Sequence, residues 1–388
     1  MGIVVLQKCE NYDKERVRKS MQNIFDSLGG IEKYVKPGLQ VALKPNLLIA
    51  KKPSDAATTH PMVVEVVAEM VIKAGGIVTI IDSPGGPYTA SFIKKVYQTT
   101  GMEAAADKVG AKLNYDLRVE NKATPKGILL KSVNLIKPLV DADVIINLAK
   151  LKTHMMMVYT GAIKNMFGAV GGTEKADYHA RMNDYDLFAT SLVDIHYSVK
   201  PTLNIIDGIM AMEGEGPGSG IPRHIGAIIA SESAFEADAI ALDIISVPHE
   251  KVPVMRVGKK HELYDKTTIE LVGDPIDEFA CSDFDVPSLH LRESGTRPAK
   301  GLLSKIGAIT RPRLVIRIQD CVRCGRCLEA CPAKVIHVQS DKNLKIDSSG
   351  CIRCFCCHEL CPENAIDIKR SFISKILVGD MMSGKLTK

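Results

Sequence analysis

The C-terminal part of this 388-residue chain contains the segment Cys321-Val-Arg-Cys324-Gly-Arg-Cys327-Leu-Glu-Ala-Cys331-Pro332, which predicts how that part folds. Its spacing is C-x2-C-x2-C-x3-C-P, and the same spacing returns in Cys351-Ile-Arg-Cys354-Phe-Cys-Cys357-His-Glu-Leu-Cys361-Pro362. Nine of the eleven cysteines lie between Cys321 and Cys361, with only Cys9 and Cys281 outside. Cysteines grouped in this way, in a chain without a signal-peptide pattern, indicate metal binding rather than secreted disulfides.

The doubled motif predicts two [4Fe–4S] clusters with crossed ligation. Three cysteines on a tight loop can face one cluster, while the fourth, before proline, leaves on a helix and reaches the other cluster. The predicted ligand sets are Cys321, Cys324, Cys327 and Cys361 for one cluster, and Cys351, Cys354, Cys357 and Cys331 for the second. Two four-thiolate zinc sites are the alternative, but zinc ribbons use paired C-x2-C knuckles and do not require the Cys-Pro exit. Cys356 is an additional thiol, which we expect to be a bystander.

This spacing resembles that of the bacterial two-cluster ferredoxins over about residues 311–370. The resemblance implies a small α+β domain with a strand pair beside the clusters, for which Val335–Val338 and Leu344–Ile346 are the candidates. Clusters of this kind carry low-potential electrons, so we expect a redox partner protein as electron donor or acceptor.

Upstream of the cysteines, strand and helix patterns alternate. The candidate strands are apolar runs bounded by turn residues, namely Gly2–Gln7, Gln40–Lys44, Ile77–Ile81, Lys112–Tyr115, Val144–Leu148 and Thr202–Ile206. Lys14–Leu28 and Pro61–Ala74 have helical periodicity. This order predicts a mostly parallel, open α/β sheet with flanking helices over residues 1–280. Residues 281–310 mix Pro, Ser, Gly and Arg and are the predicted linker, and residues 371–388 form a C-terminal tail.

Composition and charge argue against two classes of partner. The chain is 46% hydrophobic and 24% charged, with mean hydropathy near zero, which is typical of a globular protein. No apolar stretch approaches the roughly 20 residues that span a bilayer, so we expect a cytoplasmic protein without a membrane span. Residues 311–388 hold 14 Lys and Arg against 8 Asp and Glu, but no basic run alternates with aromatic residues and Trp is absent. Nucleic-acid binding is therefore not expected.

Polar side chains follow several of the predicted strands, at the edge where open α/β sheets bind their ligands. The segments are Lys44-Pro-Asn46, Asp82-Ser-Pro-Gly-Gly86, Lys150-Leu-Lys-Thr-His154 and Asp207-Gly208. Because the carboxyl ends of parallel strands meet at one edge, we expect a shared cleft there. Its predicted members are Lys44, Asn46, Asp82, Lys152, His154, Lys164 and Asn165, with Asp207 and Glu213 approaching from the next strand.

The residue types in this cleft suit an anionic small molecule. Lysines supply point charges to a phosphate or carboxylate, and His154 can act as an acid, a base or a ligand. The catalytic candidates are Lys152, His154, Lys164 and Asp82, and the cofactor-binding candidates are Lys44, Asn46, Asn165, Asp207 and Glu213. A solvated basic turn and exposed acidic turns are the alternatives. No second cofactor can be named, since the glycine-rich loops match neither a P-loop nor a dinucleotide fingerprint.

Five segments of the N-terminal part together resemble the family called domain of unknown function 362. They are Lys44-Pro-Asn-Leu-Leu48, Thr58-Thr-His-Pro61, Asp82-Ser-Pro-Gly85, Asn147-Leu-Ala-Lys-Leu-Lys-Thr-His154 and Gly161-Ala-Ile-Lys-Asn-Met-Phe-Gly168. The resemblance spans roughly residues 1–280, and a fused ferredoxin tail is a common companion in the family. The family is distantly similar to the nickel-pincer lactate racemases, which implies an α/β core and not the racemase chemistry.

Three functions are compatible with these features. In the first, a redox enzyme passes single electrons to a substrate or cofactor bound at the sheet edge. In the second, the protein is an electron carrier or adaptor whose α/β domain docks a partner redox enzyme. In the third, the clusters are structural, which eight regularly spaced ligands make the least favoured interpretation.

Overall fold

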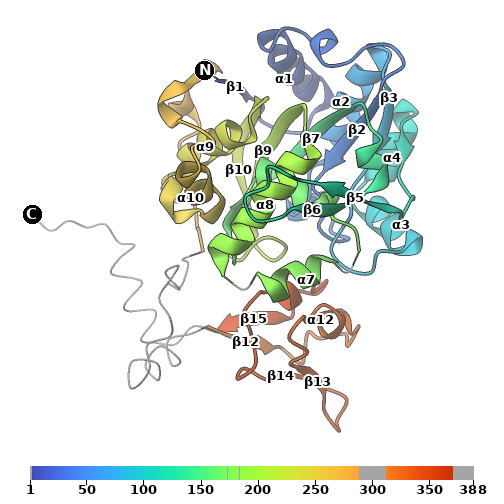
Figure 1. The fold of residues 1–388 in the computed structure, drawn as a ribbon, viewed down its shortest axis with the longest axis vertical. Helices are drawn as coiled ribbons and strands as arrows, with labels where there is room; N and C mark the ends of the chain where they lie inside the picture. Colours follow the sequence, from blue (N-terminus) through green and yellow to red (C-terminus); the bar gives the residue numbers. More distant parts are fainter. Residues whose placement is uncertain (1, 173, 183, 288–311, 370–388) are drawn as a thin grey trace, which may run out of the picture.

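The computed structural model describes residues 2–172, 174–182, 184–287 and 312–369. A nine-stranded sheet forms its centre, in the order β11-β1-β10-β9-β7-β2-β3-β4, with β8 paired to β7 (Figure 1). Its strands are β1 (Gly2–Lys8), β2 (Gln40–Pro45), β3 (Ile77–Ile80), β4 (Lys112–Leu113), β7 (Val144–His154), β8 (Val158–Thr160), β9 (Leu203–Glu213), β10 (Ile221–Ser231) and β11 (Ile269–Gly273). Only β10 and β8 pair antiparallel with their neighbours. The prediction of a mostly parallel α/β sheet is confirmed.

Helices cover both faces of this sheet. They are α1 (Lys14–Ser27), α2 (Pro61–Lys73), α3 (Ala90–Thr99), α4 (Met102–Val109), α5 (Lys137–Val140), α6 (Ala162–Asn165), α7 (Glu174–Arg181), α8 (Tyr185–Val199), α9 (Ala234–Ile244) and α10 (Pro253–Lys260). Successive side chains of a strand point to opposite faces. In β7, Ile146 therefore packs with α1 to α4, and Ile145 packs with α6, α8, α9 and α10.

The two best-predicted helices begin at side chains that cap them. Asp13 accepts a hydrogen bond from the backbone N–H of Arg16 (3.1 Å) at the start of α1. His60 Nδ1 accepts one from the N–H of Met62 (3.2 Å) at the start of α2, where Pro61 occupies the first turn. Both arrangements satisfy backbone donors that a helix leaves free at its N-terminus.

Two central strands are longer than predicted. The predicted ends were Leu148 and Ile206, but β7 continues to His154 and β9 to Glu213. All eleven residues of β7 are buried. The polar residues after Leu148 therefore lie inside a strand rather than in a loop. Lys150 pairs there with Asp207, and Lys152 donates hydrogen bonds to uncharged oxygens of other segments. The antiparallel strand β10, between β1 and β9, was not predicted.

The cysteine-rich module, residues 312–369, lies beside α7 (Figure 1). It contains two antiparallel strand pairs, β12 (Arg313–Ile316) with β15 (Ile366–Lys369), and β13 (Ile336–Val338) with β14 (Leu344–Ile346). Its short helices are α12 (Arg326–Glu329) and α13 (Cys356–Glu359). The pair β13–β14 forms the hairpin expected between the two cysteine motifs. Most of the predicted linker and all of the predicted tail lie outside the described residues.

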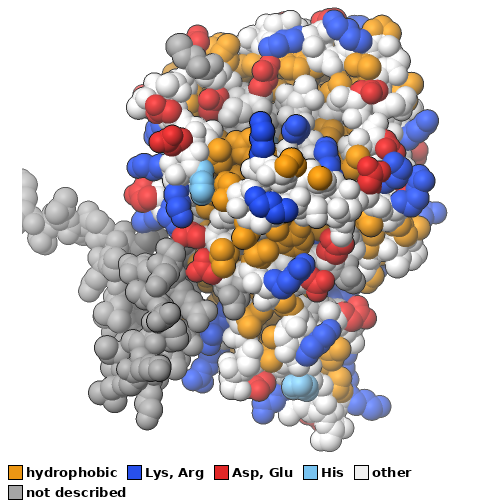
Figure 2. Space-filling view, in the orientation of Figure 1, with side chains coloured by type: hydrophobic (Ala, Val, Ile, Leu, Met, Phe, Trp, Pro, Cys, Tyr) orange, Lys and Arg blue, Asp and Glu red, His pale blue; other side chains and the backbone are white. Residues whose placement is uncertain are grey.

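The rest of the described chain adds an antiparallel pair, β5 (Val119–Ala123) with β6 (Ser132–Ile136), at one side of the sheet. Among the described residues, no helix has the length and apolar character needed to cross a bilayer. On the face shown in Figure 2, acidic and basic side chains are interspersed over both the sheet part and the module.

Candidate functional site

A cavity of about 570 Å³ separates the carboxyl edge of the sheet from the cysteine-rich module. Its walls come from the loops after β2 and β3, from α6 and α7, and from α12, α13 and the turn after Cys331. A volume of this size suits a small organic molecule or cofactor. Five of the predicted site residues line it, namely Lys44, Asn46, Asp82, Lys164 and Asn165.

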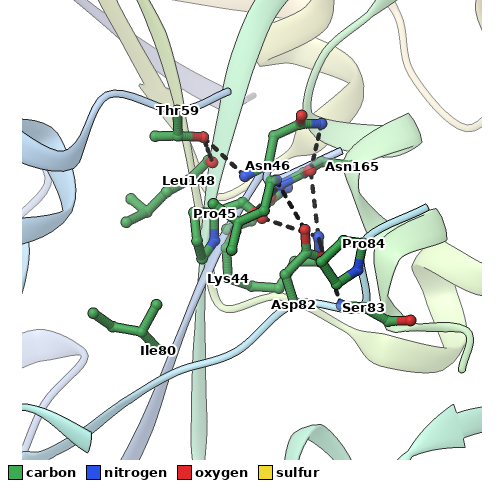
Figure 3. A network of polar contacts seen from close by, with 12 residues as sticks. Lys44, Pro45, Asn46, Thr59, Ile80, Asp82, Ser83, Pro84, Leu148 and Asn165 are labelled. Atoms are coloured by element: carbon green, nitrogen blue, oxygen red, sulfur yellow. Dashed lines mark hydrogen bonds and ion pairs between the residues drawn. The ribbon is translucent and has the colours of Figure 1, made fainter. Parts of the chain in front are cut away.

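An ion pair forms the floor of the cavity. Lys44 Nζ, at the end of β2, lies 2.6 Å from Asp82 Oδ1, and both side chains are almost fully buried. Asp82 also accepts hydrogen bonds from the N–H groups of Leu47 and Ser83, each at 2.9 Å. Burial lowers the pKa of Lys44, and the neighbouring Asp82 carboxylate opposes that effect. Figure 3 shows the two side chains meeting between the ends of their strands.

A row of amides continues from this pair across the sheet. Asn165 Oδ1 accepts from Lys44 Nζ (3.3 Å) and from Asn46 Nδ2 (3.0 Å), as drawn in Figure 3. Asn165 Nδ2 donates to Asn147 Oδ1 (2.7 Å), and Asn147 Nδ2 donates to Asn204 Oδ1 (2.8 Å). These bonds connect β2, β7 and β9 to α6. They hold Asn46 and Asn165 rigidly in the cavity wall.

Close packing at the floor requires a glycine. A Cβ at Gly168 would collide with both Lys44 Nζ and Asp82 Oδ1. A Cβ at Gly85 would likewise be too close to the module, since it would lie 2.5 Å from Leu360 Cδ2. The two glycines therefore let the backbone approach the buried pair and the module closely.

Two further lysines face the cavity from helices. Lys164 on α6 has its Nζ 5.9 Å from the ring centre of Phe167, and no hydrogen bond or ion pair joins that Nζ to any described residue. Lys175 on α7 donates hydrogen bonds to the carbonyl oxygen and to Oγ of Ser83. Burial lowers the pKa of Lys164, and burial lowers the pKa of Lys175 to about 7.

Lys152 lies behind the cavity wall. Its Nζ donates to Asn46 Oδ1 (3.0 Å), to the carbonyl oxygen of Pro217 (3.2 Å) and to that of Ala57. Burial lowers the pKa of Lys152 well below its ordinary value. This lysine therefore fixes Asn46 and two loops, and does not itself line the cavity.

His154 at the end of β7 faces the module. Its Nδ1 accepts from the N–H groups of Met156 (3.1 Å) and Met157 (3.3 Å), and burial lowers its pKa well below the usual range. The ring is therefore neutral, with its proton on Nε2. That nitrogen lies 3.2 Å from Glu359 Oε1, but the angles are not those of a hydrogen bond, and both atoms lack one within the described chain.

Other cavity-lining groups were not predicted. His179 lies one turn after Lys175 on α7, and its buried Nδ1 has no hydrogen-bond partner among the described residues. Glu359 and Cys356 enter from α13, and burial raises the pKa of Glu359. The i, i+4 spacing of Lys175 and His179 was a usable signal for α7. No local signal could place α13 against the sheet edge.

Asp207 and Glu213 do not reach the cavity, contrary to the prediction. Asp207 lies within β9 and is fully buried, where it accepts from Lys150 Nζ (2.8 Å) and from Tyr12 Oη (2.8 Å). Glu213 accepts a hydrogen bond from the N–H of Asp285 (3.1 Å), away from the cavity. The physical reason is the length of β9, which places Asp207 inside the strand and carries its end, at Glu213, away from the cavity.

The eight predicted ligand cysteines line two small spaces inside the module. Cys321, Cys324, Cys327 and Cys361 surround one, and Cys331, Cys351, Cys354 and Cys357 surround the other. All are free thiols. Each set combines three cysteines of one motif with the last cysteine of the other, which is the grouping expected for crossed ligation, although the ligands themselves stay a prediction.

The donor chemistry of these sets fits iron–sulfur clusters. In the described part of the chain, no group of three or more His, Cys, Asp and Glu side chains could hold a single metal ion. Each set of four thiols surrounds a separate space, and a [4Fe–4S] cluster would take one thiolate at each of its four irons. Cys356 lines the large cavity, whereas Phe355 and Cys357 on either side of it line the second thiol space.

The two thiol sets differ in their surroundings. Cys331 belongs to the second set and also lines the large cavity. Cys324 belongs to the first set and is exposed to solvent, and Ile318 and Val322, which precede it in the sequence, have exposed apolar side chains. The second set thus contributes a thiol to the cavity wall, whereas the first set has a thiol exposed at the surface.

Comparison with known proteins finds two family profiles that match different parts of the chain. The family profile described as a domain of unknown function (DUF362) matches residues 41–243, and that of a 4Fe-4S dicluster domain matches residues 312–371. A thylakoid-associated protein of Synechocystis sp. is 35% identical over 258 residues, which cover 66% of this chain and 78% of that protein.

A solved structure with partial similarity is the lactate racemase apoprotein of Thermoanaerobacterium thermosaccharolyticum. It is 11% identical, with a TM-score of 0.39, and the match covers 63% of this chain and 57% of the racemase. The profile match over more than half of the chain and the Synechocystis relative identify the family. The chain belongs to the family of the domain of unknown function (DUF362), and it carries a C-terminal 4Fe-4S dicluster domain.

Proposed function

We propose that this protein is an iron–sulfur redox enzyme that delivers single electrons to a small molecule bound in the cavity between the sheet edge and the module. The observation that carries the proposal is the shared wall. Cys331, a predicted cluster ligand, lines the same cavity as Lys44, Asp82 and Lys164. A [4Fe–4S] cluster bound by such thiolates supplies one-electron transfer at low potential.

The residues around the cavity would hold and shield the bound molecule. Asn46 and Asn165 are fixed by hydrogen bonds and present amides to it. Phe167 and Leu360 contribute apolar wall and exclude water from that side. A site enclosed in this way strengthens electrostatic interactions with a ligand and protects a reduced species from solvent.

Electrons would enter at the exposed part of the first thiol set. Cys324 is exposed, and Ile318 and Val322, which precede it in the sequence, are 50% and 61% exposed. Exposed apolar side chains next to a redox centre suit contact with a partner protein. We propose that a redox partner docks there, so that the first thiol set receives electrons and the second faces the cavity.

The same exposed surface favours a second candidate, an electron carrier that binds a larger redox enzyme and converts nothing itself. In that case the cavity would hold no dedicated molecule. We keep the cytoplasm, expected from the sequence, as the proposed location. The name of the Synechocystis relative makes association with thylakoids the alternative, which cell fractionation tests.

Anaerobic purification distinguishes the enzyme from the carrier. Reconstituted protein is expected to hold close to eight irons and eight sulfides, and mass spectrometry of denatured protein should find a stoichiometric small molecule, or titration should find one that is reduced. A protein with stoichiometric zinc and no acid-labile sulfide would overturn the redox proposal. Full clusters that reduce a partner enzyme, with no molecule binding the cavity, would establish the carrier instead.

A further inference from the structure

We propose that the molecule held in the cavity is an organic carboxylate, with its anionic group at Lys164 and Lys175 and an apolar body of about ring size beyond it. This inference names the substrate class of the proposed redox site and rests on that proposed function. It depends on which charges in the cavity are already compensated and on the chemistry of the remaining wall.

The first step concerns charge. Lys44 and Asp82 form a buried pair at 2.6 Å, so neither is available to neutralise a ligand. Lys164 has no hydrogen bond or ion pair within the described residues, and the Glu359 carboxylate attracts it only without direct contact. Lys175 donates only to uncharged oxygens of Ser83 and Pro84. A buried ammonium without a hydrogen-bonded anion is costly, and an oxyanion from a ligand would supply that contact.

The second step concerns polar groups without partners. His179 Nδ1 and Glu359 Oε1 are both buried, both belong to residues that line the cavity, and neither has a hydrogen bond within the described chain. His179 and Lys164 both contact the ring of Phe167, at 5.8 Å between ring centres and 5.9 Å from Nζ. His179 and Lys164 therefore flank one aromatic ring, where a ligand can meet both of them at once.

The third step concerns the rest of the wall. Beyond the lysines much of the wall is apolar, with lining side chains of Leu48, Ile49, Pro87, Pro332 and Leu360. Charged side chains of both signs, Asp177, Arg326, Glu329 and Lys334, complete it. An inorganic anion would leave the apolar part of a space of about 570 Å³ without contacts. A carboxylate attached to an apolar ring or chain satisfies both parts, because the ring replaces water along the apolar wall.

Calorimetry on the oxidised, fully reconstituted protein tests the inference without any electron transfer. The probes are benzoate, its neutral isostere benzamide, acetate and inorganic phosphate. Benzoate should bind, and benzamide, acetate and phosphate should each bind roughly tenfold more weakly or less, since they lack either the charge or the ring. Equal binding of benzoate and benzamide would show that the ligand need not be an anion. Tighter binding of phosphate than of benzoate would show that the ligand needs no apolar body.

Variants assign the subsite. Lys164→Gln should weaken the binding of benzoate by roughly tenfold and leave the binding of benzamide unchanged. Lys175→Gln should change the benzoate affinity in the same direction. Lys164→Arg should retain most of the affinity for benzoate. Lys95→Gln, on the exposed side of α3, is the charge-matched control. Iron content and far-ultraviolet circular dichroism establish that each variant is folded. If both glutamine variants bind benzoate with the affinity of the parent protein, the proposed subsite is wrong. The redox proposal is tested separately, and it fails only if no molecule bound in the cavity is reduced.

Discussion

Lys51 Nζ, from the loop after β2, lies 2.8 Å from Oδ1 of Asn364 in the cysteine-rich module. The same ammonium donates to the carbonyl oxygen of Pro362 at 3.3 Å, directly after the predicted ligand Cys361. Ser219 Oγ reaches the same Asn364 oxygen at 2.9 Å. The sheet part thus forms hydrogen bonds with the chain directly after Cys361, and the Lys51 ammonium places a positive charge near that cysteine.

That contact predicts a change in redox potential. Lys51→Met should lower the reduction potential of the cluster that includes Cys361 by roughly tens of millivolts, because a nearby cation stabilises the more negative reduced form. Electron paramagnetic resonance during a potentiometric titration measures each cluster. The neighbouring Lys52, which is exposed, provides the control Lys52→Met. An unchanged potential in Lys51→Met would show that this charge does not act on the cluster.

Crossed ligation predicts which cluster each cysteine variant damages. Cys331→Ser should impair the cluster of the Cys351 motif, and Cys361→Ser that of the Cys321 motif, because those thiols line the opposite spaces. Iron content and paramagnetic resonance of the reduced protein report the loss. Cys356→Ser should keep both clusters, since this thiol lines the large cavity instead. Loss of the cluster nearest in sequence would contradict the assignment.

The buried pair Lys44–Asp82 predicts strong coupling in stability. Lys44→Met should lower the free energy of unfolding by about 3 kcal/mol, because it leaves the Asp82 carboxylate without its cation in a buried position. The double variant Lys44→Met/Asp82→Asn should lose less unfolding free energy than the sum of the losses in the two single variants. Urea unfolding followed by circular dichroism measures these differences. As a control, Lys8→Met removes an exposed ion pair with Glu278 and should change the free energy of unfolding little. Additive losses of stability in the Lys44 and Asp82 variants would contradict the coupling.

The lowered pKa of Lys175 predicts how ligand affinity depends on pH. The charged groups that act on Lys175 are Asp82, Lys44 and Lys164, and burial is the largest cause of its pKa of about 7. The protonated amine attracts a carboxylate, so benzoate should bind best below pH 7 and progressively more weakly as the pH rises through that value. Calorimetry between pH 6 and pH 8.5 tests this at about half-unit steps. Lys175→Met should flatten the profile, and affinity that rises with pH would contradict the role of this amine.

Much of the architecture could be predicted from local sequence. The segments Gly2–Gln7, Gln40–Lys44 and Ile77–Ile81 are apolar runs bounded by turn residues, and each is a strand within one residue of its predicted ends. Lys44, Asn46 and Asp82 follow such strands and do line the cavity. Parallel strands bring their carboxyl ends to one edge, so residues at true strand ends converge by topology alone.

The errors share one physical cause. Lys150, Lys152 and Asp207 looked like the polar residues that follow a strand, but they lie inside β7 and β9. A buried lysine is costly without a compensating charge, and the partner that compensates Lys150 is Asp207, 57 residues away. Local polarity cannot distinguish a loop from a buried ion pair, because the compensating charge comes from another strand.

The paired cysteine motifs and the parallel α/β order could be predicted from local sequence, because ligand spacing and strand periodicity are properties of short segments. The positions of α7, which presents Lys175 and His179 to the cavity, and of α13, which adds Glu359, depend on long-range packing. Likewise, the placement of Cys331 in the cavity wall depends on contacts such as Lys51 with Asn364, between residues more than 300 positions apart. Such contacts form only after both parts have folded, since docking depends on the shape and charge of finished surfaces rather than on any local pattern.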